Sequence, residues 1–82
     1  MQSRLRSRLS RISTNQKVLG GKPVIKGTRI AVYLIVELLA SGMTEEGILK
    51  EYPGLAVEDI RAALEYASKR LRDEEIIELE AQ

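Results

Sequence analysis

The chain has 82 residues, 44% of them hydrophobic and 30% charged, and it contains neither Cys nor His. A chain of this length forms one small domain, which core packing or self-association must stabilise because no disulfide can form. The missing residue types exclude zinc sites built on Cys or His and catalysis by a Cys or His nucleophile. No triad or paired-acid spacing is present among the remaining polar residues. We therefore expect no enzymatic activity, no metal and no cofactor.

Charge is divided unevenly along the sequence. Residues 1–29 hold eight basic and no acidic side chains, whereas residues 30–82 hold five basic and twelve acidic ones. This separation predicts a basic surface for a polyanion such as DNA and an acidic surface for a different partner. The alternative is that the two halves neutralise each other within a dimer.

No segment is typical of a membrane protein or of a secretory signal. The apolar runs are too short to cross a bilayer. The basic start of the chain is followed by neither an apolar core nor a small-residue cleavage site. We expect a cytoplasmic protein with no membrane partner.

Composition divides the chain into three segments. Residues 1–13 are predicted to form a basic N-terminal arm, residues 14–72 a ribbon followed by three helices, and residues 73–82 an acidic C-terminal tail. The predicted fold class is mainly α. It is a three-helix helix-turn-helix domain, homeodomain-like or winged-helix-like, preceded by a short β-hairpin or ribbon.

The ribbon is predicted from turn residues. Two extended segments flank Gly20-Gly21, and Pro23 indicates an edge position because it has no donor for a ladder hydrogen bond. The two glycines and Gly27 are expected to allow turns with positive φ. A glycine-rich loop that cradles phosphate is an alternative, but the P-loop pattern is absent.

The first helix is predicted over residues 32–40, which are apolar almost all the way round. Glu37 within this run and Ser41-Gly42 after it favour a helix over a buried strand. A helix that is apolar on most sides is buried on most sides, and one small domain can scarcely cover it. We therefore expect a homodimer through this helix. The predicted interface residues are Val32, Tyr33, Ile35, Val36 and Leu39.

Two further helices complete the domain. Thr44 is a suitable N-cap for a helix that ends at Pro53-Gly54, and Gly47 is an internal weakness of about 1 kcal/mol relative to Ala. The buried stripe of this helix is predicted to be Ile48, Leu49 and Tyr52. The last helix spans residues 57–72, and its predicted buried face consists of Ile60, Leu64, Ala67 and Leu71.

The segment Gly20-Gly21-Lys22-Pro23-Val24-Ile25-Lys26-Gly27-Thr28-Arg29-Ile30 resembles the signature of the domain-of-unknown-function 433 family. The resemblance continues at residues 37–44, at Tyr52-Pro53 and at residues 58–64, and it covers roughly residues 12–67. Members of this family look like VapB-type antitoxins. The resemblance implies a three-helix fold, a PIN-like ribonuclease toxin as partner and autorepression of the operon. The chain departs from the family pattern at Ala31, at Gly47 and at Ala56, where a capping Ser or Thr is common.

Basic residues of the arm and ribbon are the candidate DNA-binding residues. The arm could follow the phosphates or enter a minor groove, as homeodomain arms do; the alternative is a solvated terminus. The third helix, which would contact bases in a helix-turn-helix, begins with Glu58 and Asp59, whose carboxylates repel phosphate. We therefore place more weight on the arm and ribbon. The candidate set is Arg4, Arg6, Arg8, Arg11, Lys17, Lys22, Lys26, Arg29 and, on the third helix, Arg61.

The acidic, partly apolar tail suits a basic protein partner such as the RNA-binding surface of a toxin. An ordinary frayed helix end is the alternative. The candidate toxin-binding residues are Glu74, Glu75, Ile76, Ile77 and Leu79. The leading interpretation is thus an antitoxin that binds operator DNA. The second is a protein-interaction module without DNA binding.

Overall fold

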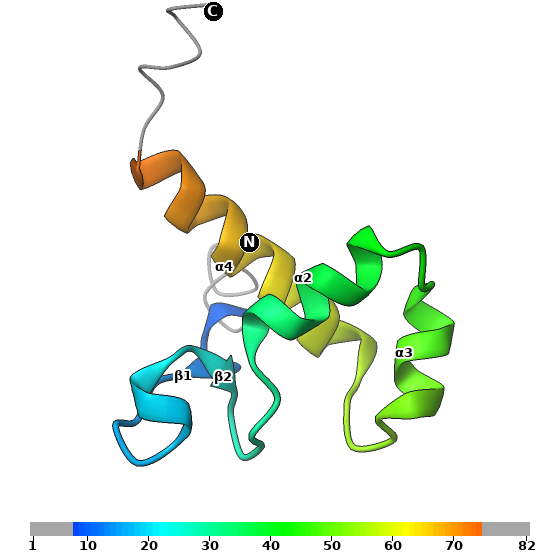
Figure 1. Ribbon diagram of the computed structural model, residues 1–82, viewed down its shortest axis with the longest axis horizontal. Helices are drawn as coiled ribbons and strands as arrows, with labels where there is room; N and C mark the ends of the chain where they lie inside the picture. Colours follow the sequence, from blue (N-terminus) through cyan, green and yellow to red (C-terminus); the bar gives the residue numbers. More distant parts are fainter. Residues whose placement is uncertain (1–7, 75–82) are drawn as a thin grey trace, which may run out of the picture.

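The structure is a computed structural model that describes residues 8–74 (Figure 1). The prediction of a mainly helical domain, with three helices after a short ribbon, is confirmed. The ribbon and α3 lie on opposite sides of the pair formed by α2 and α4. In chain order the elements are β1 (Ile12–Ser13), the 3-10 helix η1 (Leu19–Gly21), β2 (Val24–Ile25), α2 (Val32–Ala40), α3 (Glu45–Glu51) and α4 (Val57–Glu74).

The hydrophobic core lies where α2 packs against α4. Ile35 of α2, Ile48 of α3 and Ile60 of α4 are fully buried. Ile25 of β2 belongs to the same cluster. Burying an isoleucine side chain contributes roughly 1.5–3 kcal/mol, so the helices and the ribbon stabilise one another through this common centre.

The ribbon differs from its predicted form. Residues Ile12–Ser13 pair antiparallel with Val24–Ile25. The sequence placed the first pair in the basic arm and a turn at Gly20-Gly21, but these glycines lie in η1, within a longer connection. Their φ angles are 65° and 91°, so the prediction of positive φ is confirmed. Strands of two residues show too little alternation to be located from sequence.

The rest of the domain buries more of helix α2 than the apolar composition of this helix suggested. Ile35 is fully buried in the domain core, where no partner can reach it while the domain stays folded, so its assignment to a dimer interface is wrong. Val32 is 5% exposed and lines an open pocket between α2 and α4, so its predicted interface role stays a prediction. Leu39 is half-buried and packs against the core, as does Val36. Tyr33 remains 52% exposed.

Helix α3 begins as predicted. The Thr44 hydroxyl accepts a hydrogen bond from the Gly47 N–H at 3.0 Å and so caps the helix. A Cβ atom at Gly47 would lie 3.3 Å from the Thr44 hydroxyl oxygen and 3.3 Å from Met43 Cγ. Glycine therefore avoids crowding against the cap at a position where the sequence suggested only a weakness. The tight turn after α3 contains a hydrogen bond from Leu55 N–H to the Tyr52 carbonyl.

Helix α4 buries only part of the face that its periodicity predicted, since Ile60 is fully buried as expected. Leu64 and Leu71 were expected to be buried, but they are 40% and 69% exposed. The second half of α4 extends beyond the remainder of the described domain (Figure 1), so Leu71 is not covered there. The buried residues lie near the start of α4 and are Asp59, Ile60, Ala62 and Ala63.

A carboxylate side chain caps the start of α4. Ala56 has no side chain that can cap the helix, but Asp59 Oδ2 accepts a hydrogen bond from the Ala56 N–H at 2.8 Å. The other oxygen, Oδ1, accepts one from Arg11 Nη1 at 2.9 Å. The Asp59 side chain is only 9% exposed. This group therefore supplies one half of a capping box and also ties the segment before β1 to α4.

We expect Asp59→Ala to lower the free energy of unfolding by about 2 kcal/mol, because it leaves the Ala56 N–H and the Arg11 guanidinium without their partner. Urea denaturation followed by circular dichroism measures this change. Glu58→Ala is the matched control, since Glu58 is exposed in the same helical turn; its expected effect is within about 0.5 kcal/mol. Equal losses in the two variants would contradict the capping role.

Candidate nucleic-acid interface

The predicted DNA-binding residues that precede α2 fall into two groups within the described chain. The first group, Arg8 and Arg11, is bound to α4. Arg8 Nη1 lies 3.0 Å from Glu65 Oε1. Arg11 Nη1 lies 2.9 Å from Asp59 Oδ1. These two arginines therefore hold the start of the described chain against α4, a structural role that the sequence analysis missed. The other arginines of the predicted arm, Arg4 and Arg6, lie outside the described residues.

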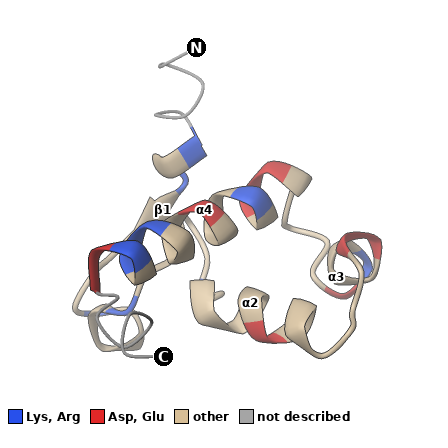
Figure 2. Cartoon of the chain, turned by 90° about the horizontal axis from the view of Figure 1, so that it is seen from above, with Lys and Arg blue, Asp and Glu red and all other residues tan. Residues whose placement is uncertain are grey.

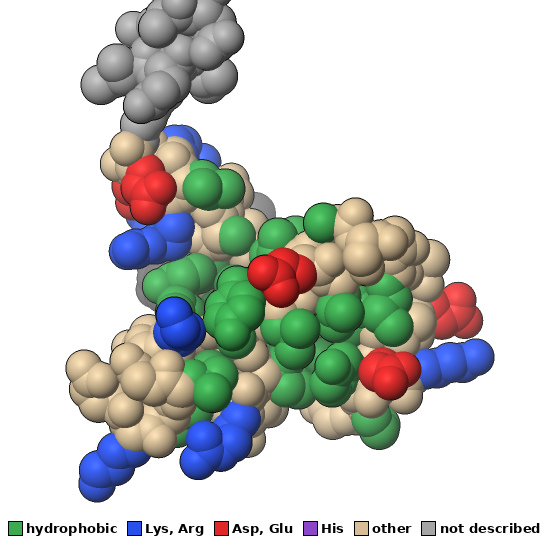
Figure 3. Space-filling model, in the orientation of Figure 1, with side chains coloured by type: hydrophobic (Ala, Val, Ile, Leu, Met, Phe, Trp, Pro, Cys, Tyr) green, Lys and Arg blue, Asp and Glu red, His purple; other side chains and the backbone are tan. Residues whose placement is uncertain are grey.

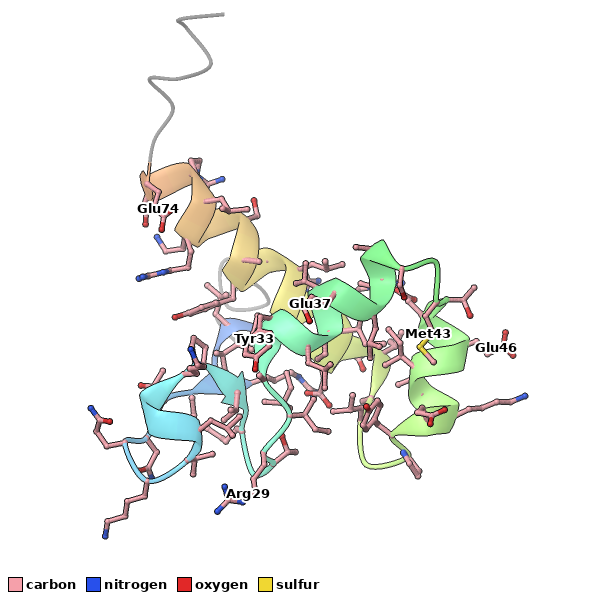
Figure 4. All side chains as sticks on the ribbon, viewed as in Figure 1. Arg29, Tyr33, Glu37, Met43, Glu46 and Glu74 are labelled. Carbon is pink, nitrogen blue, oxygen red and sulfur yellow. The ribbon has the colours of Figure 1, made fainter. Side chains whose placement is uncertain are left out.

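The second group projects from the ribbon and from the loop before α2. Its members are exposed, and we call them the basic ribbon surface: Lys17, Lys22, Lys26 and Arg29. Within residues 8–74, the side chains of Lys17, Lys26 and Arg29 form no hydrogen bond or ion pair. Figure 3 shows basic side chains projecting at this end of the molecule, and Figure 4 places Arg29 at the tip of the loop. The first acidic residue of the chain is Glu37, so no acid from this segment offsets their charge.

Lys22 differs from the other three cations in its surroundings. Its Nζ atom lies 5.9 Å from the centroid of the Tyr33 ring, at the outer limit of a cation–π contact. Because Tyr33 is the second residue of α2, this contact places Lys22 at the border between the ribbon and the α2 surface.

The loop that carries Lys26 and Arg29 is fixed by local hydrogen bonds. The Thr28 hydroxyl donates to the Ile25 carbonyl at 2.8 Å and accepts from the Ile30 N–H at 2.9 Å. Gly27 has a φ of 81°, a conformation that residues with a Cβ adopt only with strain. The turn therefore holds the backbone of both cations in a defined position, while their long side chains stay free.

The start of α4 is poorly suited to phosphate. Glu58 is exposed there, and Arg61 Nε lies 3.7 Å from Glu45 Oε2 of α3. Figure 2 shows acidic and basic positions following one another along α4 and α3. Of the candidate cations, Arg61 thus lies close to an acid, whereas no member of the basic ribbon surface forms an ion pair within residues 8–74.

The predicted toxin-binding residues lie at the end of the described chain or beyond it. Glu74 is exposed at the end of α4 (Figure 4). The remaining four, Glu75, Ile76, Ile77 and Leu79, lie outside the described residues. Among residues 8–74 no helix is long and apolar enough to cross a membrane, and no cluster of acidic side chains is arranged to hold a metal ion.

Residues 12–67 match the model of a family described as "Protein of unknown function (DUF433)". The chain belongs to the DUF433 family. It is 39% identical over 56 residues to the uncharacterized protein y4eO of Sinorhizobium fredii, an alignment that covers 68% of this chain and 25% of that protein. The chain thus matches only about a quarter of this curated relative.

A crystal structure of a DUF433 member protein from Anabaena variabilis has a similar fold. The two structures superpose with a TM-score of 0.71 at 31% sequence identity, over 83% of this chain and 67% of the other. The family match runs from β1 into the second half of α4, and it includes the whole basic ribbon surface. Arg8 and Arg11, which bind α4, lie before it.

We expect Thr28→Val to lower the free energy of unfolding by about 1–2 kcal/mol, because it removes both hydroxyl hydrogen bonds of the loop without changing its shape. Thr28→Ser keeps the hydroxyl and is the matched control. Urea denaturation gives the stability change, and amide hydrogen exchange at Ile30 reports on the loop directly. Faster exchange is expected only in the Val variant. Similar exchange in both variants would show that the hydroxyl does not hold the turn.

Proposed function

We propose that this DUF433 protein is the antitoxin of a type II toxin–antitoxin system, acting in the cytoplasm. It binds operator DNA as an autorepressor and neutralises a PIN-like ribonuclease toxin. The observation that carries the DNA-binding part is the basic ribbon surface, whose lysines and arginine are exposed and, within residues 8–74, without acidic partners. Cations that are not already paired can replace the counterions condensed on duplex DNA.

The proposed contact is mainly with the phosphate backbone. Lysine and arginine side chains on mobile stems suit phosphates, and contacts of this kind fix position and orientation without reading sequence. The exposed Glu58 disfavours insertion of the start of α4 into a groove, although α3 and α4 follow one another across a tight turn, as the helices of a helix-turn-helix do. The ribbon is therefore the proposed DNA-binding element, and base recognition by α4 is not part of the proposal.

The antitoxin part is supported by the family resemblance and by charge. Residues 30–82 carry twelve acidic and five basic side chains. A ribonuclease needs a basic surface for RNA, and an acidic partner complements such a surface. The proposed toxin-binding segment begins at Glu74, at the far end of α4 from the α3–α4 turn, so DNA and toxin use different parts of the chain.

The second candidate is a protein-interaction module without DNA binding. Exposed Tyr33 and Leu71 favour it, because large apolar side chains on a surface are typical of protein contacts. Binding to duplex DNA at low salt separates the two candidates, since the module predicts no affinity under any salt condition.

We expect the wild-type protein to bind a 30-base-pair duplex at low salt, with an affinity that falls steeply as salt is added. Lys26→Gln and Arg29→Gln should each weaken binding and reduce the slope of log affinity against log salt by about 0.9, because each removes one phosphate contact. Lys50→Gln is the matched control, since Lys50 is also exposed but lies on α3. Fluorescence anisotropy over a salt series measures all three. A wild-type protein that ignores duplex DNA in dilute buffer contradicts the proposal and favours the interaction module.

We expect a chain truncated after Arg72 to lose most of its affinity for the PIN-like nuclease encoded beside it, because the truncation removes the acidic and apolar tail. Co-expression followed by affinity capture measures the complex, and circular dichroism checks that the shortened domain is folded. DNA binding at low salt serves as the control, since the basic ribbon surface is retained. Capture that is unchanged by the truncation would remove the tail from the proposed toxin interface.

A further inference from the structure

Leu19 is a strained and exposed residue in the connection between β1 and β2. Its φ angle is 50°, and within residues 8–74 it is the one residue other than glycine with a positive φ. A leucine in this left-handed region is disfavoured because its Cβ crowds the following carbonyl oxygen, whereas glycine and asparagine adopt the conformation more readily. Its side chain is nevertheless 39% exposed. The residue thus has a backbone cost that full burial of its side chain does not offset.

Hydrogen bonds within the connection hold Leu19 in this conformation. The Leu19 carbonyl accepts a hydrogen bond from the Lys22 N–H at 3.2 Å, and the Val18 carbonyl accepts one from the Gly21 N–H at 3.0 Å. The Val18 N–H in turn donates to the Asn15 carbonyl at 2.7 Å. A strained residue persists only where its surroundings determine its conformation, and such residues are enriched at functional sites. The Leu19 side chain therefore projects from a fixed backbone.

Packing against the core does not explain a leucine at this position. Leu19 belongs neither to the buried core cluster nor to the partly buried side chains that pack against it. Within residues 8–74 the other large exposed hydrophobic side chains are Tyr33, Leu64 and Leu71, and all three lie on helices. Surfaces that bind proteins are typically contiguous apolar patches of several hundred Å², and a single exposed leucine on the ribbon does not form one.

Exposed cations flank Leu19 on both sides. Lys17 precedes it by two residues and Lys22 follows it by three, and both belong to the basic ribbon surface. Figure 1 places η1, which begins at Leu19, at the end of the ribbon on the side away from α3. An apolar side chain between two cations fits the minor groove of DNA, which is about 6 Å wide and bordered by phosphates.

We propose that Leu19 inserts into the minor groove of duplex DNA as an apolar wedge at a base step, with Lys17 and Lys22 on the flanking phosphates. This inference rests on the DNA binding proposed above and adds a sequence preference to it. Insertion partly unstacks the base step, so a step that deforms at low cost, such as TA, is preferred. Contact with phosphate alone carries no such preference.

Leu19→Asn separates insertion from a structural role. Asparagine removes the apolar side chain and tolerates the left-handed backbone, so the urea midpoint should stay the same or rise. The affinity for a 30-base-pair duplex with a central TA step should fall by about tenfold or more, because burial of the leucine side chain is lost. The slope of log affinity against log salt should not change, because no phosphate contact is removed. Fluorescence anisotropy over a salt series measures both quantities.

A second leucine and a second duplex serve as controls. Leu64→Gln is the matched variant, since Leu64 is 40% exposed but lies on α4, and its affinity for DNA should equal that of the wild type. 2-Aminopurine placed beside the TA step reports unstacking. Its fluorescence should rise on saturation with wild-type protein but not with Leu19→Asn. On a duplex of G·C pairs alone, the wild type and Leu19→Asn should bind equally.

Three results would overturn the inference while leaving DNA binding in place. They are equal affinity of the wild type and Leu19→Asn for the TA duplex, a lower salt slope in the variant, and a lower urea midpoint in the variant. Loss of nuclease capture by Leu19→Asn with unchanged DNA affinity would assign the side chain to a protein contact instead. A wild-type protein that binds no duplex in dilute buffer overturns the proposed DNA binding itself, and this inference with it.

Discussion

The buried carboxylate of Asp59 joins parts of the domain that lie 48 residues apart in sequence. A charge with so little exposure must be paired, since an unpaired buried ion is strongly destabilising. Its two oxygens bind the Ala56 N–H and the Arg11 guanidinium. Arg11 directly precedes β1, and β1 pairs with the strand that contains the buried Ile25. One side chain thus connects the start of α4, the ribbon and the core.

This pairing also changes where the positive charge of the N-terminal region can act. Arg8 and Arg11 are bound to acids of α4, so the described part of the predicted arm is a structural attachment. The cations of residues 8–29 that form no ion pair lie on the ribbon and its loops. The attachment therefore holds the ribbon rigidly on the helices, with its lysines and Arg29 directed to solvent. Sequence position alone suggested that the arm and ribbon were one basic surface, but the structure gives them different roles.

Features determined by neighbouring residues were predictable, whereas features determined by distant ones were not. The Thr44 cap, the buried Ile48 and the order of three helices follow from local patterns, and the structure confirms them. The contact between Arg11 and Asp59 spans 48 residues, and no local signal pairs one charge with another at that distance. The periodicity of α4 likewise predicted an apolar face on this helix. It could not predict how far along α4 the neighbouring elements extend, so Leu71 was wrongly expected to be buried.

The basic ribbon surface borders α2 at Lys22, whose Nζ atom lies 5.9 Å from the centroid of the Tyr33 ring. Lys26 and Arg29 lie on a turn that the Thr28 hydroxyl and Gly27 hold in place, so the cations project from a fixed backbone. In the proposed complex these side chains contact phosphates, which set the position and orientation of the domain on a duplex. Base recognition by α4 is not required for contacts of this kind, and the exposed Glu58 at the start of α4 disfavours it.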